Sequence, residues 1–190
     1  MVQDEVGPDP EVVSDCVTYG HRSTHIYRGQ KADIWDGGHR IPLLVSWPDH
    51  VPQNARSDDL ICLTDIFATP ADVLDEPLPR CAAEDSFSFF SLLRGPNSGE
   101  AARSTVIHHS LSGMFAVRNG RWKLIPELGS GGFTPPKSRE PSPGEPPGQL
   151  YDMQNDPSEG ENLYDEWPDV VSRLRNILEK ARDNDRTAPQ

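Results

Sequence analysis

The chain has 190 residues, enough for one domain with its own core or for part of a larger protein. Its hydrophobic fraction of 35% is low for a self-contained domain, and its 19 prolines are about twice the usual share. A formal net charge of −12 argues against nucleic-acid binding, because such proteins present a basic face to the phosphates. We therefore expect folded segments separated by loops, and no nucleic-acid partner.

Targeting and membrane signals are not apparent in the sequence. No long apolar run occurs, so we expect no membrane span and no membrane partner. The N-terminal stretch MVQDEVGPDPEVV has neither the basic nor the apolar region of a signal peptide. We expect no export signal in this chain, and its compartment stays open.

The first half of the chain predicts one strand and one helix. Residues 1–30 are polar and contain Gly-Pro-Asp-Pro, which favours irregular structure. The apolar run IPLLVSW, residues 41–47, predicts a buried strand. The apolar positions of residues 60–74 predict a short apolar run that leads into a helix, with Thr64 as its N-cap and Pro70 as a site for a kink.

Strand signals dominate after a long connection over residues 75–103, in which DSFSFFSLLRG is expected to anchor to a core. The hydrophobic period then becomes two, which predicts antiparallel strands over 104–110, 114–120 and 121–127. Asn119-Gly120 between the last two indicates a two-residue type I′ turn, because both of its positions need positive φ.

The C-terminal part begins with a loop. Residues 127–149 hold six prolines and five glycines, so an exposed loop or disordered insertion is predicted. In it Phe133 is a candidate for local packing or for a ligand contact, although loop tips more often do neither. A short strand follows at QLYD. The apolar spacing of residues 170–181, with Pro168 in the first turn, predicts an amphipathic helix packed on the antiparallel strands.

One lysine stands out in a glycine-rich stretch. Lys31 follows Gly29 and precedes Gly37 and Gly38, so we expect a tight loop whose backbone approaches a ligand. A lysine ammonium is a compact cation that suits sulfate or phosphate. A surface lysine in an ordinary turn is the alternative. Arg28 and Arg40 place further positive charge near Lys31, and Asp33 and Asp36 place negative charge there that opposes it.

His39 follows the glycine pair, and we place it nearest to the predicted pocket. A competing metal site would have to use two other pairs of histidines, His21 with His25 and His108 with His109. His21 and His25 would share a face only in a helix, which their segment does not resemble, and His108 and His109 point to opposite faces of a strand. We therefore predict no metal site here. The sequence offers an anion-binding lysine but no nucleophile motif.

Five motifs resemble those of the sulfatase family, and they occur in the family's order. The segment YRGQKADIWDGGHRIPLLVSWP resembles Gly-x-Lys-x4-[Glu/Asp]-Gly-Gly-x-Arg-x-Pro. The segments SDDLICLTDIFATPADVL and DSFSFFSLLRG resemble two further motifs, with Ser86 where glycine is usual. FAVRNGRWKLI and QLYDMQNDPSEGENL resemble the closing motifs. The resemblance is to arylsulfatase-type members of the alkaline-phosphatase-like superfamily, and covers roughly residues 19–183.

The resemblance implies an α/β fold. Residues 1–103 would be a fragment of an alkaline-phosphatase-like α/β sandwich, at the end of the large catalytic domain. Residues 104–190 would form a small antiparallel sheet packed by a C-terminal helix. The implied activity is sulfate ester hydrolysis, in which Lys31 binds a sulfate oxygen and neutralises charge during S–O cleavage. His39 would be its neighbour in the substrate pocket, and the expected ligand is a sulfated small molecule or sulfated glycan.

Family members also use a formylglycine, made in a Cys/Ser-x-Pro/Ala-x-Arg motif, and a calcium ion. None of Cys16, Cys62 and Cys81 begins that motif, and the family's Asp-Asn-Gly metal motif is absent upstream of Lys31. We therefore expect no cofactor on this chain, and a missing N-terminal catalytic part as its partner. Two alternatives remain: a non-catalytic chain that binds sulfated glycans or assembles with a partner, and a phosphodiesterase or phosphonate hydrolase of the same superfamily.

Overall fold

The structure is a computed structural model that describes residues 20–21, 23–79, 81–95 and 101–188. Most of the irregular chain predicted over residues 1–30, and Cys16, lie outside the described residues. The chain divides into two compact units. The first runs up to Ile41 and includes His108–Ala116 and Arg121–Val171; the second holds Pro42–Ile107, Val117–Gly120 and the chain from Ser172 onward. The predicted division between residues 103 and 104 stays a prediction.

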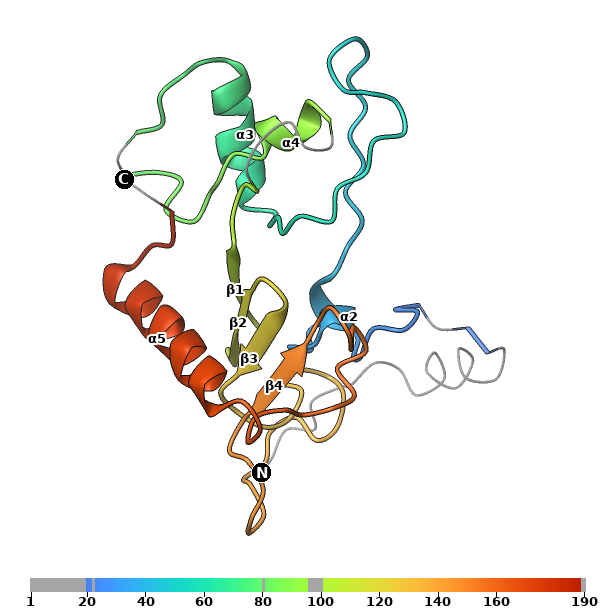
Figure 1. Cartoon of the computed structure of the whole chain (residues 1–190), viewed down its shortest axis with the longest axis vertical. Helices are drawn as coiled ribbons and strands as arrows, with labels where there is room; N and C mark the ends of the chain where they lie inside the picture. Colours follow the sequence, from blue (N-terminus) through green and yellow to red (C-terminus); the bar gives the residue numbers. More distant parts are fainter. Residues whose placement is uncertain (1–19, 22, 80, 96–100, 189–190) are drawn as a thin grey trace, which may run out of the picture. The chain divides into compact units, whose positions relative to one another are not determined.

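Eight helices and strands are described, in the chain order drawn in Figure 1. They are α2 (Asp36–His39), α3 (Asp65–Val73), α4 (Phe90–Leu93), β1 (Thr105–His109), β2 (Phe115–Asn119), β3 (Trp122–Ile125), β4 (Gln149–Asp152) and α5 (Pro168–Asn184). The four strands form one sheet in the order β1-β2-β3-β4. β3 and β4 pair antiparallel, with Trp122 opposite Asp152 and Ile125 opposite Gln149. The predicted small sheet with a C-terminal helix is therefore confirmed.

The core of the first unit joins the sheet to the stretch that follows Lys31. Ile34 is fully buried and Trp35 is 3% exposed. They share one cluster with Met114, Ala116, Ile125, Tyr151 and Met153. Burial of large apolar side chains stabilises such a cluster by about 1.5–3 kcal/mol each. The Lys31 stretch is thus fastened to the sheet by its own apolar residues.

The predicted buried strand over residues 41–47 is wrong. No strand is present there, and Leu44 is 89% exposed and Ile41 60% exposed. A strand needs a hydrogen-bonded neighbour, and the one sheet among the described residues is made by segments between Thr105 and Asp152. The apolar run predicted that residues 41–47 would be buried, but no described segment of the chain covers them.

The hairpin between β2 and β3 also differs from the prediction. Asn119 belongs to β2, so the two-residue loop is Gly120-Arg121, and only Gly120 has a positive φ, at 57°. Glycine in the first loop position is the pattern of a type II′ turn rather than type I′. The Asn119 side chain instead donates hydrogen bonds to Ser104 O and Thr105 Oγ1.

The first part of the loop over residues 127–149 is not exposed, contrary to the prediction. Residues 128–132 are buried. Gly129 and Gly131 have φ values of 108° and 62°, and a Cβ on Gly129 would lie 2.5 Å from Lys137 O. These glycines let the segment fold back on itself, and Gly131 N donates to Lys137 O at 2.7 Å. Composition alone predicted a loop correctly but missed its packing.

The helix α3 starts where it was predicted to start, directly after Thr64, and contains Pro70. Thr64 makes no capping hydrogen bond, because its hydroxyl donates to Asp85 O at 3.0 Å. Ser86, which replaces the glycine usual in the resembled motif, accepts a hydrogen bond from Ala68 N and donates one to Thr64 O. The serine hydroxyl thus links the motif to α3.

The C-terminal helix is confirmed as well. α5 begins at Pro168, and its apolar residues Leu174 and Leu178 are 0% and 3% exposed. Arg173 donates to Asn119 Oδ1 at 2.6 Å, so the helix contacts the end of β2. Within the described ranges, none of the helices combines the length and the apolar character needed to cross a bilayer.

Candidate functional site

Lys31 lies on an exposed turn immediately before the buried residues of the first unit. Ala32 follows it with a backbone φ of 81°, a value that residues other than glycine rarely adopt. Leu111 N donates to Ala32 O at 2.9 Å, which holds this strained position in place. No hydrogen bond or ion pair occupies the Lys31 ammonium within the described part of the chain.

The carboxylate of Asp33 holds the turn. Asp33 is fully buried, and its Oδ2 accepts a hydrogen bond from Gln30 N at 2.9 Å. Its Oδ1 accepts from Phe133 N at 2.7 Å and from Thr134 N at 3.1 Å, and Thr134 Oγ1 donates to Oδ2. A buried carboxylate is tolerated only when such donors replace water. Asp33 therefore ties the Lys31 turn to the loop after β3.

A buried ion cluster holds α2, which follows the turn. Lys123 Nζ lies 2.9 Å from Asp36 Oδ1 and 2.7 Å from Glu159 Oε1. Asp36 N also donates to Glu159 Oε2 at 2.6 Å. Burial raises the pKa of the Glu159 carboxyl, while the Lys123 ammonium opposes that rise. The three residues come from three of the quoted motifs, which therefore meet at one point.

Sequence reasoning missed Lys123 and Glu159. The sequence did contain a signal at Lys123. This charged residue lies in a predicted strand between Trp122 and the apolar pair Leu124-Ile125. Charged residues at inward strand positions are almost always paired. Nothing in the local sequence indicated Glu159 as the partner, since it lies in a turn-rich segment.

The glycine pair permits a close approach, as predicted, but the approaching group is the chain itself. A Cβ on Gly37 would lie 2.4 Å from Arg28 O, and one on Gly38 would lie 2.2 Å from Asp33 O. Gly37 N donates to Arg28 O at 2.7 Å. The expected approach of this backbone to a ligand is thus replaced by packing of α2 against residues 28–33.

The two arginines near Lys31 have different surroundings. Arg28 stacks on Trp35, with 3.9 Å from its Cζ to the ring centroid, and donates to Tyr151 Oη and Glu159 O, each at 3.0 Å. Burial raises the pKa of Tyr151 to about 12, so its hydroxyl stays protonated. Arg40 is 47% exposed on its side chain. It lies 3.9 Å from Asp36 Oδ2 and its Cζ is 4.6 Å from the centroid of the Tyr27 ring, so both arginines contact other groups of the protein.

His39 ends α2 and packs against His108, with 4.2 Å between the ring centroids. Burial lowers the pKa of both imidazoles, to about 3 for His108, and the Lys123 ammonium lowers them further. His108 Nε2 donates to Ile34 O at 3.2 Å. His39 Nε2 is buried and has no hydrogen-bond partner among the described residues. The role of His39 in substrate binding stays a prediction.

The described residues do not fit the calcium ion that the resemblance implies. They contain no group of three or more His, Cys, Asp or Glu side chains placed to hold a metal. The acidic groups of the site already have partners, since Asp33 accepts from Gln30, Phe133 and Thr134, while Lys123 pairs with Asp36 and Glu159. No step below passes through a metal.

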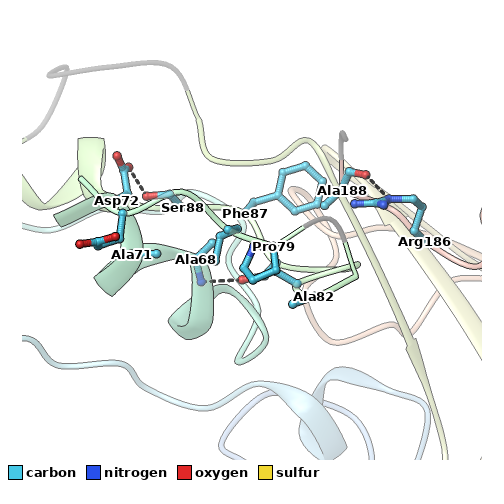
Figure 2. A pocket seen from close by; sticks show the side chains of 13 residues that line it. Ala68, Ala71, Asp72, Pro79, Ala82, Phe87, Ser88, Arg186 and Ala188 are labelled. Atoms are coloured by element: carbon cyan, nitrogen blue, oxygen red, sulfur yellow. Dashed lines mark hydrogen bonds between the residues drawn. The ribbon is translucent and has the colours of Figure 1, made fainter. Parts of the chain in front are cut away.

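The second unit contains a cavity of about 470 Å³, shown in Figure 2. Ala68 and Asp72 of α3 line it together with Phe87, Ser88 and Arg186. Ser88 Oγ donates to Asp72 Oδ2 at 2.5 Å, and Arg186 Nε donates to Ala188 O at 2.9 Å. Neither Lys31 nor His39 lines this cavity.

Over most of its length the chain is homologous to the sulfatase family, as its motifs predicted. An N-acetylgalactosamine-6-O-sulfatase from Bacteroides thetaiotaomicron is 34% identical over 163 residues, which cover 86% of this chain and 31% of that protein. Human arylsulfatase G is 27% identical over 166 residues, covering 78% of this chain and 29% of the enzyme. No model of a known protein family matches the sequence.

A solved structure shows the same relationship. It comes from the Bacteroides thetaiotaomicron locus for metabolism of multiple glycosaminoglycans and is 33% identical to this chain, with a TM-score of 0.73. The match covers 87% of this chain and 34% of that one. The chain therefore spans about a third of the length of the sulfatases that it matches.

Proposed function

We propose that this chain supplies the sulfate-binding lysine of a sulfatase that hydrolyses sulfate esters of sugars. The observation that carries the proposal is the exposed ammonium of Lys31 on a turn that is fixed on both sides. Asp33 ties the turn to the loop after β3, and the Lys123 cluster holds α2 behind it. A cation that is already in place needs no reorganisation when charge develops on the sulfate oxygens.

Homology and motif order support the wider assignment. The N-acetylgalactosamine-6-O-sulfatase that the chain resembles acts, by its name, on a sulfated amino sugar. We extend that substrate class to this chain. We also assign residues 1–103 to the end of a large α/β catalytic domain and residues 104–190 to a small C-terminal subdomain. The nucleophile and the calcium ion of the family then belong to further polypeptide that acts together with this chain.

His39 has a part in the same proposal. Its imidazole is neutral at pH 7, because burial and the Lys123 ammonium lower its pKa. Its buried Nε2 has no partner among the described residues, and buried polar atoms in proteins are normally hydrogen-bonded. A sugar hydroxyl would satisfy it by donating a hydrogen bond to this nitrogen of the neutral ring.

Calorimetric titration tests the proposal. The full chain is titrated with N-acetylgalactosamine 6-sulfate and, separately, with the unsulfated sugar. We expect only the sulfated sugar to bind, and Lys31→Ala to weaken its binding by about tenfold or more, as for a lost charge-assisted contact. Lys180→Ala is the matched control, because it removes an exposed lysine from α5. Equal binding by the two variants would refute the role of Lys31.

The second candidate function is a non-catalytic chain that binds sulfated glycans. One observation favours it: every residue described as fixing the Lys31 turn belongs to this chain and to its first unit. The lysine is then held in place without further polypeptide. Sulfated-sugar binding that depends on Lys31, without any sulfate release after the rest of a sulfatase is supplied, would favour this candidate.

A further inference from the structure

A second segment of the chain, residues 130–134, packs against the residues that directly follow Lys31, although 100 residues separate Asp33 from Phe133. A Cβ on Gly132 would lie 2.5 Å from the carbonyl carbon of Ala32, the residue after Lys31. Real Cβ atoms do not come so close to a backbone, so only glycine allows this packing. Ile34 N also donates to Ser130 O at 2.8 Å.

The segment and the turn are held as one body. Asp33 accepts hydrogen bonds from the amides of Phe133 and Thr134, at 2.7 Å and 3.1 Å. Gln30 Nε2, on the other side of Lys31, donates to Thr134 Oγ1 at 3.3 Å. Thr134 is therefore bonded to residues that precede and follow Lys31. Residues 130–134 therefore lie next to the turn that carries Lys31.

Phe133 is the one large apolar side chain of residues 130–134, whose sequence is Ser-Gly-Gly-Phe-Thr. Residues 130–132 are buried, whereas Phe133 keeps part of its surface exposed. Its ring is not part of the core cluster of the first unit. It makes no aromatic stacking or cation–π contact among the described residues.

We infer that Phe133 is a specificity-determining residue of the Lys31 site. Its ring packs on the apolar face of the sugar whose sulfate group binds Lys31. Binding sites commonly combine an aromatic or apolar surface with a few polar groups that fix orientation. Lys31 then recognises the sulfate, and Phe133 recognises the ring that carries it. The inference rests on the proposed function of Lys31 and adds the feature that distinguishes a sulfated sugar from a free anion.

The test compares two ligands on one set of variants. The full chain is titrated with N-acetylgalactosamine 6-sulfate and with inorganic sulfate, the second by NMR because its binding is weak. Phe133→Ala is expected to weaken sugar binding by about tenfold and leave sulfate binding unchanged, since the aromatic contact is made to the sugar alone. Phe133→Tyr, which keeps the ring, is expected to bind as the parent does. Phe67→Ala removes an exposed phenylalanine from α3 and is the matched control.

Each outcome decides the inference. Equal weakening for both ligands, or for neither, contradicts the role of Phe133, while sulfate binding that still depends on Lys31 leaves the proposed function intact. Sugar binding that does not depend on Lys31 refutes the proposed function and this inference together. If Phe133→Ala does not fold by circular dichroism, Phe133→Leu replaces it. Loss of sugar binding in Phe133→Leu but not in Phe133→Tyr supports the inference, and equal binding by the two refutes it.

Discussion

The ammonium of Lys123 lies 2.7 Å from the Oε1 atom of Glu159, and neither side chain has exposed surface. Asp36 completes the cluster at 2.9 Å from the same nitrogen. An unpaired charge at such a depth costs several kcal/mol, so the three groups hold one another in place. Because Asp36 begins α2, the cluster also fixes the end of the stretch that carries Lys31.

Breaking this cluster is expected to destabilise the chain strongly. Lys123→Met leaves the carboxylates of Asp36 and Glu159 without their cation, and we expect a loss of about 3–5 kcal/mol in the free energy of unfolding. Urea denaturation followed by tryptophan fluorescence measures it. Arg139→Ala, which removes a partly exposed ion pair with Glu145, is the control and should leave the urea midpoint unchanged. Similar midpoints for both variants would show that the buried cluster is unimportant.

The His108 imidazole predicts a loss of stability in acid. Burial lowers its pKa from 6.5 to about 3, so the folded state binds the proton less readily than the unfolded state. The contribution of His108 is fully present above pH 6.5 and is lost as the pH falls from 6.5 toward 3. His108→Gln should therefore flatten the decline of the urea midpoint across this window.

Other groups contribute to acid sensitivity, so the comparison is between variants. His50→Gln removes an exposed histidine of the second unit and should keep the parent's slope. A His108→Gln slope equal to that of His50→Gln would mean that the buried imidazole titrates normally.

Gly38 is expected to tolerate no side chain. A Cβ there would lie 2.2 Å from Asp33 O, which is a rigid backbone atom. We expect Gly38→Ala to cost about 1–3 kcal/mol of unfolding free energy through overpacking. Gly160→Ala is the control, because its Cβ would meet nothing closer than 3.7 Å. Thermal unfolding should show a clear drop only for Gly38→Ala, and an unchanged melting temperature would mean that α2 shifts freely.

The chain by itself is expected not to hydrolyse an aryl sulfate. A positioned lysine stabilises charge, but sulfate transfer also needs a nucleophile, and none of the three cysteines begins the family's nucleophile motif. The measurement is release of 4-nitrophenol from its sulfate ester over a long incubation. Hydrolysis by the parent chain that disappears in Lys31→Ala, and persists in Lys180→Ala, would contradict this expectation.

Local patterns in the sequence predicted much of the secondary structure. The alternation of apolar and polar residues around residues 105–125 and the helical spacing of apolar residues after Pro168 depend on neighbours within a few positions. They can therefore be recognised without knowing the fold. The strand predicted over residues 41–47 failed for the opposite reason. Its apolar composition is local, but a strand also needs a partner from elsewhere, and Leu44 is left exposed in the described chain.

The sequence by itself predicted the homology to sulfatases, through five motifs in order, and it singled out Lys31. Only the tertiary structure showed that Asp33 binds the amide of Phe133, 100 residues away, and that Lys123 pairs with Asp36, 87 residues away. Such contacts join groups whose sequence neighbourhoods contain no information about each other. They form because a buried carboxylate or ammonium must find a partner once water is excluded, and the folded backbone decides which partner is within reach.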